Sequence, residues 1–172
     1  RTGTGAGARG LECAVFSASS CDSSFEKVLS FSKEDLSHTE EVVSIEGVSL
    51  IKTPEIDDAY EFIISTEKKT GYPKTLINFQ KPGTGVWSID LLKSKNGLEA
   101  FDLGSMYTIA RSEKGSTLHY KDPVVFNLEN GQTHVIFCHH PFSWSSSNTG
   151  LLTRQQGSES FDLISENILE RG

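Results

Sequence analysis

Short runs of β-branched and aromatic residues alternate with turn residues along most of the chain, and no other feature constrains its fold as strongly. The clearest example lies at 124–139, where Glu129-Asn130-Gly131 separates two β-branched runs. Asn-Gly is a strong hairpin signal because both residues accept the positive φ of a tight turn. Strands separated by such short turns are typical of antiparallel sandwiches and barrels.

The runs that we expect to form strands share this composition and are bounded by Gly, Pro, Asn or charged residues. They lie at 11–18, 42–45, 48–51, 60–65, 74–79, 86–93, 98–103, 106–111, 117–120, 124–128 and 133–139. Glu46-Gly47 predicts a tight turn between two of these strands, and Glu67-Lys68-Lys69-Thr70-Gly71 is assigned to a polar turn. We predict an antiparallel β-sandwich, or a flattened barrel, of about nine strands.

Two segments have helical spacing and predict a short helix near each end of the chain. At 23–37 apolar residues share one helical face, and Ser32 with Asp35 matches a capping box. At 158–170 apolar residues again recur at helical spacing. Residues 1–10 are rich in Gly and predict a flexible arm, which leaves 11–172 as a single β-rich domain.

The chain is acidic: 16 Lys and Arg stand against 23 Asp and Glu, which gives a net charge of −7. Nucleic-acid backbones and anionic membrane surfaces repel such a protein unless its basic residues cluster, and here they do not. No run approaches the roughly 18 apolar residues of a membrane span. We therefore expect no nucleic-acid partner, and a membrane partner is disfavoured.

The cysteines and the first residue give information on the compartment in which the protein is found. The sequence does not begin with Met, and its only Met is Met106, which indicates a processed precursor or an excised domain. Cys13 and Cys21 are close enough to pair in an oxidising compartment, which leaves Cys138 over. The alternative is three reduced thiols. These two observations favour a secreted or extracellular protein, and a cytoplasmic location stays an alternative. The sequence does not predict the oligomeric state.

Histidines near Cys138 suggest a metal site. Alternate residues of a strand share a face, so Cys138 and His140 are expected to point the same way, about 7 Å apart. His119 lies on a nearby predicted strand, and one Cys with two His would suit zinc. Only three ligands can be placed, whereas a structural zinc site uses four. The alternative is a buried cysteine in a core strand.

The segment His134–Pro141, which reads His-Val-Ile-Phe-Cys-His-His-Pro, resembles the late His-containing strand of calcineurin-like metallophosphoesterases. That family also uses Asp-x-His, Gly-Asp-x-x-Asp and Gly-Asn-His motifs for its metals, and none of them occurs in this sequence. A Cys138–His pair acting as nucleophile and base is a further enzymatic alternative. Because Val-Ile-Phe precedes it, Cys138 is expected in the core, whereas a nucleophilic thiol needs an exposed, electropositive setting.

Two loops are candidate binding segments. Trp144 lies in a Ser-rich loop at 143–150, and Phe142 directly precedes it. Aromatic residues at such positions either fold back over the sheet or contact a protein, glycan or lipid. Glu55, Asp57 and Asp58 form an acidic loop with the oxygen ligands that Ca²⁺ prefers. The EF-hand pattern is absent, so a solvated acidic loop is the simpler interpretation of these three residues.

The segment Val124–Asn148, a hairpin followed by a Pro-aromatic step, resembles the central hairpin of actinoporin-like pore-forming proteins. It lacks the dense Tyr and Trp cluster that those proteins use for lipid headgroups, and the net charge is acidic. No functional residue is carried over from this resemblance. A lipid-binding or pore-forming alternative would use Phe142 and Trp144.

The residues and spacings complete no catalytic or cofactor constellation. We therefore expect no enzymatic activity and no bound cofactor, although zinc binding stays an open alternative. We predict a non-enzymatic recognition module that binds a protein partner. An acidic surface favours a basic partner through complementary potential. The alternatives are a metal-dependent hydrolase centred on His119, Cys138 and His140, and the lipid-binding module.

Overall fold

The computed structural model describes residues 12–54, 56–71, 74–75, 85–94, 96–112, 114, 119–139 and 148–169. Within these ranges the chain forms two short 3-10 turns, η1 (Lys33–Asp35) and η3 (Leu103–Ser105). The same ranges contain the strands β1 (Glu12–Ser17), β2 (Glu26–Ser32), β3 (Val42–Lys52), β4 (Tyr60–Lys68), β5 (Val86–Ser94), β6 (Tyr107–Arg111), β7 (Lys121–Asn127), β8 (Thr133–His139), β9 (Asn148–Arg154) and β10 (Asp162–Ser165).

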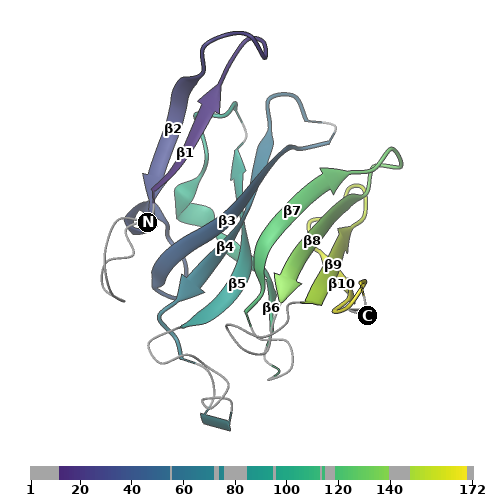
Figure 1. The fold of residues 1–172 in the computed structure, drawn as a ribbon. Coiled ribbons are helices and arrows are strands. Elements are labelled where there is room, and N and C mark those ends of the chain that lie inside the picture. The colour runs from purple at the N-terminus through teal and green to yellow at the C-terminus, as the bar shows by residue number, and fades with distance from the viewer. Residues whose placement is uncertain are drawn as a thin grey trace.

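The strands form three sheets, and every pairing between them is antiparallel. One sheet is the β1–β2 hairpin, the second has the order β3-β4-β5-β6, and the third has the order β10-β9-β8-β7. Figure 1 shows the hairpin and the β7–β10 sheet on opposite sides of the β3–β6 sheet. The predicted mainly-β, antiparallel fold is confirmed, but the single sandwich or flattened barrel is wrong, because the first two strands form a separate hairpin.

The central strands β4 and β5 are buried on both faces, because each face packs against a different layer. Facing the hairpin is a cluster that contains Phe31 from β2, Phe62 and Ile64 from β4, and Leu92 from β5. Facing the β7–β10 sheet is a second cluster that contains Ile63, Ile89, Leu91, Tyr120, Val135, Phe137 and Leu152. Successive residues of β4 therefore enter different cores, as the two-residue period of a strand requires.

Both predicted terminal helices are wrong. Residues 26–32 of the first segment form β2, which pairs with β1 and buries Phe31, and only η1 follows it. The capping box is present at η1, where Asp35 accepts from the backbone N–H of Ser32 at 2.8 Å. The second segment contains β10, which pairs with β9. In both cases strand pairing overrides a weak helical periodicity, because it satisfies backbone groups across a sheet.

The predicted turn at Glu46-Gly47 is also wrong, because β3 runs through it as one strand. Its register against β4 shifts between Glu46 and Val48, so Gly47, with φ of 61°, forms a bulge. A Cβ at Gly47 would lie 2.7 Å from the Cα of Asp122, so a side chain has no room where β7 crosses β3. Glycine at a bulge meets both the conformational and the steric requirement.

Several strand boundaries also differ from the prediction. Glu67 and Lys68, assigned to a turn, extend β4 and are buried. The run at 98–103 forms a turn and a single bridge between Ser94 and Phe101, and the described residues of 117–120 are not in a strand. Strand β9 begins at Asn148, inside the segment assigned to a loop. The run at 74–79 lies almost wholly outside the described residues.

The last predicted hairpin is confirmed. β7 and β8 pair across the turn at Asn130-Gly131, where Gly131 has φ of 80°. The run at 86–93 is confirmed as β5, and the run at 106–111 corresponds to β6. At the centre of the third sheet, a Cβ on Gly150 of β9 would lie 2.2 Å from Phe137, so the ring packs directly on backbone.

Candidate functional site

The predicted zinc ligands are not brought together in the part of the chain that the structure describes. His119 is buried just before β7, and its φ is 61°. Cys138 lies half-buried on β8, on the face that points away from the core, and His140 lies outside the described residues. Among the described residues, no group of three His, Cys, Asp or Glu side chains is arranged to hold a metal ion. Zinc binding remains a prediction.

The setting of Cys138 is unfavourable for a thiolate. Burial raises the pKa of the Cys138 thiol, and the nearby Asp122 carboxylate raises it further, while Lys121 opposes both. A nucleophilic cysteine needs a lowered pKa. The buried histidine of this strand is instead His139, whose Nε2 bonds the backbone carbonyl of Glu166.

The structure describes only some of the other predicted site residues. Asp57 and Asp58 are exposed in the turn between β3 and β4, and the Asp57 carboxylate lies 3.7 Å from the Lys52 ammonium. Glu55 of this acidic loop lies outside the described residues, as do Phe142 and Trp144. Cys13 lies on β1 and Cys21 on the following turn, and with Cys138 they are free thiols in this structure. The Cys13–Cys21 bridge remains a prediction for oxidising conditions.

A buried ion pair between Lys68 of β4 and Asp90 of β5 lies at the centre of a polar cluster. The two side chains are fully buried, and Lys68 Nζ lies 2.6 Å from Asp90 Oδ2. Lys68 also donates to Ser88 Oγ at 2.9 Å and to Thr66 Oγ1. The three donors of the ammonium therefore meet three acceptors. Burial lowers the pKa of Lys68, and the Asp90 carboxylate opposes that shift.

The cluster continues to His38, which anchors the segment between β2 and β3. Thr108 Oγ1 donates to Asp90 Oδ1 at 2.6 Å, and His38 Nε2 lies 3.1 Å from Thr108 Oγ1. His38 Nδ1 accepts from the backbone N–H of Glu40 at 3.0 Å. Nδ1 therefore carries no proton, and the ring is the neutral Nε2–H tautomer, which donates to Thr108.

Ser88 beside Lys68 has the composition of a Ser–Lys catalytic pair, but the geometry does not support catalysis. Ser88 is completely buried, and its hydroxyl lies 3.2 Å from each oxygen of Asp90. A nucleophile must reach a substrate, and this oxygen is closed off by the chain. The cluster is a satisfied polar core.

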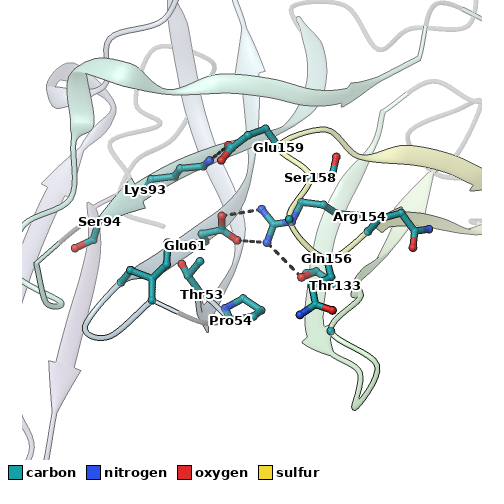
Figure 2. Close-up of a pocket in the computed structure, with 15 residues that line it drawn as sticks. Thr53, Pro54, Glu61, Lys93, Ser94, Thr133, Arg154, Gln156, Ser158 and Glu159 are labelled. Carbon is teal, nitrogen blue, oxygen red and sulfur yellow. Dashed lines mark hydrogen bonds and ion pairs between the residues drawn. The ribbon is translucent and has the colours of Figure 1, made fainter.

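A cavity of about 500 Å³ opens at one end of the two four-stranded sheets. Its floor is a buried ion pair between Glu61 of β4 and Arg154 of β9, in which two parallel hydrogen bonds each measure 2.7 Å. Figure 2 shows these side chains meeting from opposite sheets, with a second ion pair, Lys93–Glu159, across the same opening. Thr133 also accepts from Arg154, at 3.2 Å.

The outward face of the β7–β10 sheet carries a row of aliphatic side chains. Val124, Ile136 and Leu151 are cross-strand neighbours on β7, β8 and β9. The adjacent row contains Phe126 and His134, whose rings lie 5.6 Å apart. We call these five residues the outer apolar face. Val124 is 58% exposed and Phe126 is 36% exposed.

Sequence reasoning missed the two buried ion pairs, although the chain contains a signal for each. Asp90 stands inside the apolar run Val86–Leu92, and Glu61 stands inside the run Tyr60–Ile64. A charged residue at such a position needs a buried partner, because an unpaired charge in a core is very costly. The partners Lys68 and Arg154 are distant in sequence, so spacing alone could not name them.

Comparison with models of known protein families and with characterised proteins finds no match for this chain. In the described part of the chain, no helix has the length and apolar character needed to cross a membrane.

Proposed function

We propose that the protein is a non-enzymatic recognition module that binds a basic protein partner through the outer apolar face. The observation that carries this proposal is the cross-strand row Val124, Ile136 and Leu151 on the side of the sheet that points away from the core. In an antiparallel sheet with one solvated face, polar residues normally occupy these positions. Of this row Val124 is 58% exposed, whereas Ile136 and Leu151 are half-buried. An apolar row that remains partly open to solvent is typical of an interaction surface.

Charge supports a basic partner. Asp122 is exposed and lies near Cys138, and Asp162 is exposed at the end of the row that contains Phe126 and His134. The whole chain has a net charge of −7. Such a surface attracts basic partners and repels a second copy of itself, because like charges would meet across a symmetric interface.

The polar groups of the described cores also favour recognition over catalysis. Lys68–Asp90 and Glu61–Arg154 are buried ion pairs; the first joins two strands of one sheet, and the second joins the two four-stranded sheets. The metal-dependent hydrolase remains an alternative that depends on His140, and native mass spectrometry of the purified chain tests it by the presence or absence of bound zinc.

A fluorescent peptide of alternating lysine and leucine is a suitable probe, because its strand presents one basic and one apolar face. We expect fluorescence anisotropy to show binding that weakens as NaCl rises from low to high concentration. Val124→Lys should reduce the affinity about ten- to hundredfold, since burying one valine contributes about 1.5–3 kcal/mol.

Val48→Lys is the matched control, because Val48 is 41% exposed on β3, in a different sheet. It should bind the peptide as the unmodified chain does. Equal losses in the two variants would contradict the proposed face. An affinity that does not change with NaCl concentration would contradict the electrostatic contribution to binding. A glutamate–leucine peptide that binds with equal affinity would contradict the preference for a basic partner.

A further inference from the structure

We infer that the cavity at the sheet ends is a second binding site, separate from the outer apolar face, for a small uncharged molecule with an apolar body. Its volume of about 500 Å³ falls within the range of about 300–1,000 Å³ that is usual for ligand pockets. The cavity forms where residues 53, 54, 56 and 59, together with the loop 155–159, meet the ends of β4, β5, β8 and β9.

The buried ion pair at the cavity floor disfavours a charged ligand there. Four charged side chains line its described part, and they form two pairs, Glu61–Arg154 and Lys93–Glu159. An anionic ligand that paired with Arg154 would have to displace Glu61, and Glu61 is only 1% exposed. Displacement would leave a buried carboxylate without its partner, which is strongly unfavourable. The same argument applies to a cation that competes with Arg154.

The other residues that line the cavity indicate the chemical character of the ligand. Pro54, Ile56 and Ala59 form an apolar wall, and the Ile56 side chain is 55% exposed where a ligand would cover it. Thr53 and Ser158 add hydroxyl groups to the lining. Pockets with apolar walls and a few hydrogen-bonding groups are typical of small-molecule sites. The matching ligand has an apolar body with one or a few uncharged hydrogen-bonding groups.

Nile red, an uncharged solvatochromic dye, is the probe. We expect its emission to rise and shift to the blue with saturable binding to the full chain. Ser158→Trp should weaken binding about tenfold or more, because an indole ring occupies part of the cavity. Ser19→Trp is the matched control, since Ser19 is an exposed serine in the turn between β1 and β2 and does not line this cavity. It should leave the affinity unchanged.

Ile56→Asp provides a second variant if Ser158→Trp does not fold, because position 56 is exposed and a carboxylate there makes the apolar wall polar. It should also weaken dye binding. The absence of saturable binding, equal affinities in the two Trp variants, or efficient competition by the anionic dye ANS would overturn the inference. Loss of dye binding in Val124→Lys but not in Ser158→Trp would place the dye on the outer apolar face and also overturn it.

Discussion

Replacing Lys68 by methionine should destabilise the protein severely, because the change removes the counter-charge of a fully buried carboxylate. Lys68 and Asp90 are both 0% exposed and lie 2.6 Å apart. Removing one partner of such a pair costs about 3–5 kcal/mol, since the remaining charge stays desolvated. The hydroxyls of Thr66, Ser88 and Thr108 still contact Asp90, which places the expected loss toward the lower end of that range.

Urea unfolding followed by tryptophan fluorescence measures this loss. With a denaturant slope of about 2 kcal/mol per molar, a loss at the lower end of that range should lower the midpoint by about 1.5–2 M. The neighbouring Lys69→Met is the matched control, because Lys69 also lies 2.6 Å from a carboxylate, that of Glu41, but both side chains are more than 60% exposed. Its effect should stay below about 1 kcal/mol. Similar midpoints for the two variants would refute the assignment of Lys68–Asp90 as a buried pair.

Three further predictions follow from other sites. Burial, with a contribution from Lys68, lowers the pKa of His38 below the ordinary value of 6.5, so stability is present above that value and is lost as pH falls through the folded-state pKa. His38→Gln should therefore lose less stability than the unmodified chain between pH 7 and pH 5, and parallel losses in urea titrations would contradict this. Gly150→Ala should lower the free energy of unfolding by about 1–3 kcal/mol through overpacking against Phe137. Gly71→Ala is the control and should be nearly neutral, because an added Cβ there meets nothing within 4 Å. Equal melting temperatures for the two variants would refute the close packing at Gly150. Burial raises the pKa of the Cys13 thiol to about 11, so iodoacetamide near neutral pH should label exposed Cys21 well before Cys13, and mass spectrometry showing the reverse order would contradict their placement.

Local patterns predicted the strands where turn chemistry and strand chemistry agreed. Asn130-Gly131 between two β-branched runs gave the β7–β8 hairpin, and the run 86–93 gave β5. The terminal helices were wrong because their spacing described only a few residues, while the decisive interactions were with β1 and β9. Gly47 illustrates the same limit: its positive φ was foreseen, but a turn and a bulge both require it.

The candidate sites depended on long-range pairing, which residue spacing cannot supply. Arg154 reaches Glu61 from another sheet, across 93 positions of sequence. The outer apolar face could not be predicted from the sequence for a similar reason. Val124, Ile136 and Leu151 become neighbours only through the pairing register of β7, β8 and β9. The two-residue period of β8 was predicted, but its direction was wrong: Cys138 was expected in the core, whereas His139 is the inward residue.

The most direct test of the proposed recognition surface is methyl NMR of the full chain, titrated with the lysine–leucine peptide. We predict that the methyl resonances of Val124, Ile136 and Leu151 shift together and saturate at one affinity. The methyl groups of Val48 and Leu50, which are 41% and 39% exposed on β3, should not move. Shifts at Val48 and Leu50 with none at the outer apolar face, or no shifts at all, would contradict recognition of a basic partner through the β7–β10 sheet.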